Sequence, residues 1–293
     1  MAKAVTNEDR IMKELPNIIE WMVALGLPAH NSRYARYEEH INKFFRDGLN
    51  PLSEEGKQLF KELNQAYREC VDIYIVYRCF EKVRHQNFID KLSKVVSGQD
   101  VPDLQVAGAS RNFLFELLVA ARFHLAGYVI DFDETSDVVA KRDGVTVRAE
   151  CKRLASEKQL EKRINAAADQ LATAIAATNE ETIGVIYIDV SSCVVSDVRQ
   201  LVESADEAEN EMAVAIRRFL VRNANLIETL NQKHIDVSYA TCMIGTLPIW
   251  SQDFVLHTSA ATDVRAAETL SDKKFEQLKK VLAGFDETLT KLF

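Results

Sequence analysis

The N-terminal part of the chain follows a helical pattern of apolar positions. Apolar residues recur at spacings of three and four from 7 to about 25, which predicts a helix that is broken near Pro16. The same spacing predicts a second helix over 31–47 and a long helical segment over 53–96 that contains a break. The stretch 97–102, which contains Gly and Pro, is the best candidate for a domain boundary.

Beyond this boundary the pattern changes to strands that alternate with helices. Strands are predicted over 128–132, 137–142, 145–153, 183–190, 235–244 and 254–257. Helices are predicted over 110–126, 157–177, 205–231 and 271–292. Strands interleaved with helices indicate an α/β layer fold. We therefore expect a helical region over 1–100, for recognition or oligomerisation, and an α/β domain over 101–293 with a C-terminal helical extension.

The composition is that of an ordinary globular protein. Hydrophobic residues make up 47% and charged residues 27% of the 293 residues, which is enough to bury a core and argues against disorder. The five cysteines form no C-x-x-C pair, so neither a disulfide framework nor a zinc site is expected. We find no apolar run of about 18 residues and no secretory signal, so we expect a cytoplasmic protein without membrane association.

Charge is unevenly distributed along the chain. The formal net charge of −8 disfavours nucleic-acid binding by itself, because phosphate contacts require clustered cations. The segment 141–163 differs, with eight basic residues against four acidic ones. The candidates for phosphate contacts in this segment are Lys141, Arg142, Arg148, Arg153, Lys158, Lys162 and Arg163. A solvated helix face with i,i+4 ion pairs is the alternative interpretation of the same residues.

The strongest chemical signal lies in the stretch from Asp137 to Lys152. Within it, Asp143-Gly144 is a typical two-residue hairpin turn. Counting outward from this turn places Asp137 directly opposite Glu150, and strand periodicity places Lys152 on the same face as Glu150. We therefore expect two carboxylates and one ammonium group to converge on one patch of the sheet.

This convergence requires a cation, because like charges that face each other across a strand pair are destabilising. Lys152 supplies one positive charge, and a divalent cation would supply more. Mg²⁺ prefers carboxylate and backbone carbonyl oxygens, and these are offered by Asp137, Glu150 and the carbonyl of Cys151. Shared coordination requires the two carboxylates to lie within about 7 Å of each other.

The pattern resembles the PD-(D/E)xK nuclease superfamily, in which an Asp begins one strand and Glu-x-Lys lies late on the next. The matching residues are Asp137 and Glu150-Cys151-Lys152, with Glu116 on the preceding helix and Gln170 on the following one. The order of elements over 110–190 is similar to the αβββαβ core of that superfamily, the restriction-endonuclease-like fold with a mixed sheet. This chain departs from the pattern at Ser136, where the motif has Pro.

Spacing alone would be a weak signal. An acid-x-Lys triplet occurs three times in the chain, at 55–57, 150–152 and 272–274. The first and the last lie in helical segments, without a partner Asp in a hairpin. Only the middle triplet has a strand context, an acid at the matching register position and a basic flank.

The resemblance implies metal-assisted hydrolysis of phosphodiester bonds. Asp137 and Glu150 would hold Mg²⁺, for which Mn²⁺ is expected to substitute, and Glu116 would bind the metal directly or through water. Lys152 would orient the attacking water or help to deprotonate it. Gln170 corresponds to a further polar active-site residue of some members. Glu116 and Gln170 also have a plainer interpretation as solvated residues on the surfaces of their helices.

The sequence therefore predicts a metal-dependent nuclease, with DNA as the favoured substrate and a role in defence or DNA processing. The alternative is a non-cleaving nucleic-acid-binding or scaffold protein that is built on the same core. The further candidate partners are a second copy of the chain, which would supply two active sites for cutting both strands, and a regulatory protein or ligand.

Overall fold

The computed structural model describes residues 2–4, 8–37, 39, 54–98, 109–133, 136–199, 201–251, 256–283 and 285. The described strands are β1 (Ala2–Ala4), β2 (Val129–Asp131), β3 (Val138–Arg142), β4 (Val145–Arg153), β5 (Thr182–Asp189), β6 (Leu201–Val202), β7 (Ala240–Ser251) and β8 (Leu256–Ala266). The described α-helices are α1 (Glu8–Ala24), α3 (Glu54–Phe80), α4 (Gln86–Val96), α5 (Ala109–Leu125), α6 (Leu160–Ala176), α7 (Ser191–Val194), α8 (Ala205–Arg222), α9 (Ala224–Lys233) and α10 (Asp272–Leu282). Short 3-10 helices lie at η1 (Ala29–Asn31), η2 (Glu157–Gln159) and η3 (Val195–Asp197). None of the described helices is long and apolar enough to cross a membrane.

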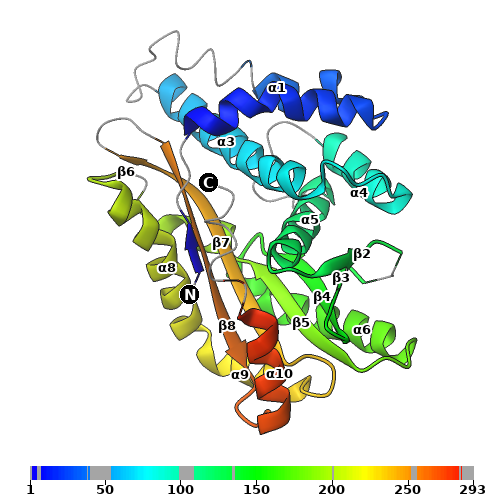
Figure 1. The fold of residues 1–293 in the computed structure, drawn as a ribbon. Helices are drawn as coiled ribbons and strands as arrows, with labels where there is room; N and C mark the ends of the chain where they lie inside the picture. The colour runs from blue at the N-terminus through cyan, green and yellow to red at the C-terminus, as the bar shows by residue number, and fades with distance from the viewer. Residues whose placement is uncertain are drawn as a thin grey trace.

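The described strands form one mixed sheet of eight strands. Its order is β1-β8-β7-β5-β4-β3-β2, and β6 pairs with β7 outside this path. The central strands β4, β5 and β7 run parallel, whereas β2, β3 and β4 are antiparallel neighbours and β8 runs antiparallel to β7. A parallel pair needs a crossover connection, which α6 supplies between β4 and β5. The expectation of an α/β fold with a mixed sheet is confirmed (Figure 1).

The β3–β4 hairpin has the register that the sequence predicts. Asp143 and Gly144 have φ values of 51° and 76°, as the central residues of a type I′ turn require. The last pair of the ladder is Val138 with Ala149. The turn thus fixes which residues face each other where β3 begins.

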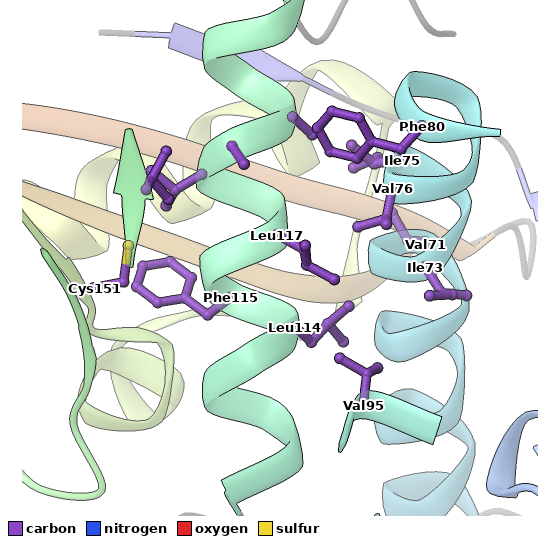
Figure 2. Packing of buried hydrophobic residues seen from close by; sticks show 14 of the residues in the cluster. Val71, Ile73, Ile75, Val76, Phe80, Val95, Leu114, Phe115, Leu117 and Cys151 are labelled. Carbon is purple, nitrogen blue, oxygen red and sulfur yellow. The ribbon is translucent and has the colours of Figure 1, made fainter. Parts of the chain in front are cut away.

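Helix α5 joins the N-terminal helices to the sheet. In Figure 2, Leu114 and Leu117 point from α5 toward α3, whereas Phe115 points toward Cys151 of β4. Buried side chains of α1, α3, α4 and α5 belong to one hydrophobic cluster with residues of β3, β4, β5, β7 and β8. The N-terminal helices therefore share a core with the α/β part of the chain.

Helices α6, α8 and α9 cover the other face of the sheet. Alternate residues of β5 divide between the two faces, because side chains of a strand point to opposite sides. Tyr187 belongs to the cluster with α5, whereas Ile186 and Ile188 belong to the cluster with α6, α8 and α9. Gly184 lets the segment before β7 lie directly on β5, since a Cβ at this position would be 1.8 Å from the carbonyl oxygen of Val237.

Two helix predictions need correction. Helix α1 runs through Pro16, where a break was expected, and the side chains of Leu15 and Ile18 on either side are fully buried. Burial of one apolar face of α1 holds both halves in line despite the lost backbone hydrogen bond. The single helix expected over 205–231 is two helices, α8 and α9, separated at Asn223. The Asn223 side-chain amide donates to the carbonyl of Phe219, which stabilises this break.

One strand prediction was displaced and another was too short. The strand expected over 235–244 is β7, which begins five residues later and ends seven residues later. The strand expected over 254–257 is β8, with 11 residues, and residues 254 and 255 lie outside the described part. Strand β8 carries Thr258, Ser259 and Thr262, which are buried although they are polar, so apolar alternation could not reveal it. The short elements β1, β6 and α7 were not expected either.

Some expected features lie wholly or partly outside the described residues. Most of the helix expected over 31–47 does so, and its described portion over 33–37 is helical. The boundary over 97–102 is described only at its first two residues. The helix expected over 271–292 ends at Leu282, and residues 286–293 are outside the described part.

A core substitution tests the shared core. Phe80 of α3 is 2% exposed, and its ring contacts Phe88 of α4, His124 of α5 and Phe132 after β2. We expect Phe80→Ala to lower the free energy of unfolding by about 3–5 kcal/mol, because it leaves a cavity between these elements. Val129→Ala, at a side chain that is 71% exposed, should change it by less than about 0.5 kcal/mol. Urea denaturation measures both values, and equal effects of the two substitutions would contradict the shared core.

Candidate active site

The candidate site lies where β3 begins and β4 approaches its end. Beyond the last ladder pair, Asp137 and Glu150 face each other, and the Asp137 amide lies 3.4 Å from Oε1 of Glu150. The Cys151 amide donates to Oδ2 of Asp137 at 2.9 Å. The Asp137 carboxylate thus takes the place of a main-chain acceptor at the open end of the hairpin. The sequence-derived register is confirmed at this point.

Lys152 lies between the two carboxylates. Its Nζ is 3.0 Å from Oδ2 of Asp137 and 3.0 Å from Oε2 of Glu150. Two atoms at this distance from one nitrogen are at most 6.0 Å apart, which is within the separation that shared coordination requires. The structure therefore brings the three central candidates together.

The three side chains differ in exposure and in the environment of their charges. Glu150 is 3% exposed, whereas the side chains of Lys152 and Asp137 are 14% and 21% exposed. Burial raises the pKa of Glu150 to about 7, the Asp137 carboxylate adds to this shift, and Lys152 opposes it. Burial alone would lower the pKa of Lys152, but Asp137 and Glu150 outweigh it and hold this pKa above its usual value. Lys152 is therefore a charged donor.

Glu116 reaches the site from α5, together with a residue that the sequence analysis missed. Lys91 of α4 forms an ion pair with Oε2 of Glu116 at 2.7 Å and donates to the main-chain carbonyl of Asp137 at 2.8 Å. Burial and the nearby Asp137 carboxylate raise the pKa of Glu116, and Lys91 opposes this shift. No sequence motif marks Lys91, because only the folded chain brings α4 beside the hairpin.

The main chain and the side chain of Cys151 have separate roles. Its N–H points toward the β3 side of β4, beyond the last ladder pair of the two strands. In a strand, the C=O of a residue points to the same edge as its N–H. The carbonyl oxygen is therefore directed toward the Asp137 side, as a metal-binding role would need. The thiol is buried on the other face near Phe115, and burial raises its pKa well above the usual value (Figure 2).

Gln170 forms no hydrogen bond to the carboxylates of the site. It is an exposed residue of α6, and within the described part of the chain no hydrogen bond joins it to Asp137, Glu150 or Lys152. This placement agrees with the plainer interpretation of Gln170 as a surface amide.

Of the seven basic candidates, four contact other residues of the protein and three lie around the start of α6. Arg148 is 2% exposed, and its guanidinium donates a hydrogen bond to the Ser136 hydroxyl inside the protein. Lys141 forms an ion pair with Asp131, and Arg142 donates to the carbonyls of Ala126 and Lys280. Arg153 is paired with Asp189. The remaining three, around the start of α6, are Lys158 and Lys162, which are exposed, and Arg163, which is half-buried.

A buried ion-pair network connects α3 to the ends of β4 and β5. Oδ2 of Asp189 accepts from Arg68 of α3 at 3.0 Å and from Arg153 of β4 at 2.8 Å. Although burial favours the neutral acid, these two guanidinium groups hold the pKa of Asp189 well below its usual range. Since Arg153 directly follows Lys152, this network fixes the end of the strand that carries the site.

The donor set fits a hard cation that is held by few protein ligands. Among the described residues, no group of three or more His, Cys, Asp and Glu side chains is arranged to hold a metal ion. Mg²⁺ is usually bound by one or two carboxylates, several waters and substrate phosphates rather than by a complete protein cage. The oxygens of Asp137 and Glu150 and the carbonyl of Cys151 meet this smaller requirement. A metal ion would compete with Lys152 for the same carboxylates.

Comparisons with known proteins add no further constraint on this site. No protein-family model matches the chain, and neither the curated proteins nor the solved structures give a match. The interpretation of the site therefore depends on the geometry and chemistry of its residues.

The buried position of Glu150 predicts a specific dependence of stability on pH. A carboxyl with a pKa of about 7 in the folded chain keeps a proton that the unfolded chain releases above the ordinary glutamate pKa of 4.5. Between these values, Glu150 therefore lowers the free energy of unfolding as pH rises. We expect Glu150→Gln to gain stability relative to wild type as pH increases from about 5 to about 8 in the presence of a chelator.

Urea denaturation at several pH values measures this difference, with Glu161→Gln, at an exposed carboxylate of α6, as the control. The control should differ from wild type by a constant amount. A constant difference for Glu150→Gln as well would contradict the placement of Glu150 beside Asp137.

Proposed function

We propose that the protein is a metal-dependent nuclease that hydrolyses phosphodiester bonds of nucleic acid, with DNA as the favoured substrate. The observation that carries this proposal is the single ammonium group of Lys152, 3.0 Å from a carboxylate oxygen of Asp137 and 3.0 Å from one of Glu150. Paired carboxylates beside a fixed cation are suited to binding a divalent metal and a phosphate together.

The arrangement of elements supports a restriction-endonuclease-like αβββαβ core for this activity. In chain order, α5 is followed by β2, β3 and β4, then by α6 and β5. The first three strands are antiparallel neighbours, and β5 lies parallel to β4. Asp137 lies before β3, and Glu150 and Lys152 lie late on β4, which is consistent with the superfamily motif and supports the proposal. The helices of 1–100 would then serve recognition or oligomerisation.

Asp137, Glu150 and the carbonyl of Cys151 would hold Mg²⁺ or Mn²⁺, and Glu116 would contribute directly or through water. When bound, such a metal polarises the phosphoryl oxygen and lowers the pKa of a coordinated water. Lys91 keeps Glu116 and the main chain of Asp137 in place through its two short contacts. This pairing reduces the repulsion between neighbouring carboxylates.

Lys152 has a different task from the carboxylates. Its ammonium group is held between Asp137 and Glu150, so it is directed at the position where a bound phosphate would approach them. There it would orient the attacking water and stabilise the negative charge that develops on the phosphoryl oxygens. A fixed charge in a partly buried site acts more strongly than a mobile one in water.

The proposal predicts which substitutions abolish cleavage. We expect Asp137→Asn and Lys152→Met each to reduce the rate of cleavage by at least about 10²-fold, because each removes a fixed charge at the reacting phosphate. Asp143→Asn is the matched control, since Asp143 is an exposed residue of the β3–β4 turn and Asn also tolerates its positive φ. Its rate should equal that of wild type.

Labelled single- and double-stranded DNA and RNA, incubated with Mg²⁺, Mn²⁺ or a chelator, provide the measurement. Urea denaturation of each variant checks that it is folded. Cleavage that persists in folded Asp137→Asn would contradict the assigned site. Tight binding by wild type without cleavage under any metal would instead favour the non-cleaving nucleic-acid-binding alternative.

A further inference from the structure

A pocket of about 360 Å³ lies between α4, α5 and the β2–β3 region, directly beside Asp137. Helix α4 supplies Asn87, Asp90, Lys91 and Lys94 at successive spacings of three, one and three residues, which form one face of a helix. The opposite wall comes from α5 and from residues around β2. Because α4 belongs to the N-terminal helices, this pocket exists only where they meet the strands of the candidate site.

Three contacts follow one another along the pocket. At one end, the Lys94 ammonium lies 4.7 Å from the centre of the Phe113 ring. In the middle, Lys91 contacts Glu116 and Asp137. At the other end, the Asn87 side-chain amide donates to the carbonyl of Phe132. Asp137 and Glu116 therefore line the pocket near its middle, and Glu150 and Lys152 lie next to Asp137 outside the lining.

The lining combines a cation, apolar walls and acceptors for hydrogen bonds. Lys94 is exposed and has no ion pair within the described part of the chain, so its charge is available to a phosphate. Ile130 and Phe132 are half-buried and present apolar surface on which a base could stack. Asp131 accepts from Lys141 and from the Asp133 amide, and Asp90 accepts from Gln86. Their remaining lone pairs could accept from the amino groups of a base.

The size of the pocket limits what can enter it. A volume of about 360 Å³ is near the lower end of the ~300–1,000 Å³ range of small-molecule sites, so it holds one nucleotide-sized group. A base pair within a duplex could not enter without opening. Enzymes that act on a base or a strand inside such a pocket need an unpaired or extruded nucleotide.

We propose that this pocket binds one unpaired nucleotide next to the phosphate that is cleaved, with its own phosphate at Lys94 and its base between α5 and β2. The substrate is then a single strand, or a strand end that has opened. The position beside the cleaved phosphate rests on the proposed nuclease function, whereas the binding of an unpaired nucleotide does not.

Binding under a chelator tests the pocket without any need for activity. The probes are a labelled DNA strand of about 12 nucleotides, the RNA strand of the same sequence and the corresponding blunt DNA duplex, and fluorescence anisotropy measures their affinities. We expect wild type to bind the better of the two single strands at least ~10-fold more tightly than the duplex, because a duplex must first open an end pair. The comparison of DNA with RNA identifies which strand is preferred.

The variant Lys94→Ala tests the phosphate contact. Loss of one contact to a single strand should reduce the magnitude of the slope of log affinity against log salt concentration by about 0.7. Lys82→Ala removes a charge from another exposed lysine, in the turn after α3, and should leave the slope unchanged. Both side chains are exposed, so neither substitution is expected to impair folding.

Each outcome separates the two proposals. Equal or tighter binding of the duplex, or equal slopes for Lys94→Ala and Lys82→Ala, would overturn the pocket assignment. Metal-dependent cleavage that Asp137→Asn abolishes would then still support the nuclease. Conversely, a preference for single strands that depends on Lys94, without cleavage under Mg²⁺ or Mn²⁺, would support the nucleotide pocket and refute the nuclease.

Discussion

The rest of the site depends on the contact of one ammonium group with two carboxylates. The β3–β4 turn fixes the register of the hairpin, and that register places Asp137 opposite Glu150. Without a cation, two such charges would repel each other across the strands, and one of them is almost fully buried. Lys152 makes the arrangement stable, because strand periodicity puts it on the face of Glu150. Removing either partner would leave a poorly solvated charge, which costs more than the pair itself contributes.

The N-terminal helices complete this arrangement and are not merely attached to it. Lys91 of α4 neutralises Glu116 and holds the main chain of Asp137, while Arg68 of α3 holds Asp189 beside Arg153 of β4. These contacts lie at the start of β3 and at the end of β4, so both strands of the site are fixed from the helical part of the chain. The sequence pattern divides the chain at about residue 100. The ion pairs and hydrogen bonds around the site, however, join residues from both sides of this boundary.

The sequence was most informative where local rules determine the structure. The Asp143-Gly144 turn fixes the hairpin by backbone conformation alone, so the convergence of Asp137 and Glu150 could be counted from it. Lys91 could not be found in this way, because it lies 46 residues from Asp137 and reaches it only through the packing of α4 on α5.

The main errors in the predicted elements arose where burial in the folded chain overrides a local sequence preference. Pro16 was expected to break α1 on local grounds, but burial of an apolar face overrides that preference. Strand β8 was underestimated because its polar residues, such as Thr258 and Ser259, are buried between neighbouring strands. Arg148 and Arg153 stay untested as candidates for phosphate contacts, but the fold already engages both guanidinium groups, Arg148 with Ser136 and Arg153 with Asp189.

The use of these arginines inside the fold limits how the proposed binding to nucleic acid would work. A chain with a net charge of −8 gains little from long-range attraction to a polyanion, and its basic segment supplies few exposed cations. Under the proposed function, affinity would then come from a small number of local contacts, for which Lys94 in the pocket and Lys158 and Lys162 near the start of α6 are the candidates. Few phosphate contacts imply weak binding to arbitrary duplex, so selection falls to whatever can enter the pocket. The acidic net charge and the pocket of the size of one nucleotide would thus both restrict the proposed substrate.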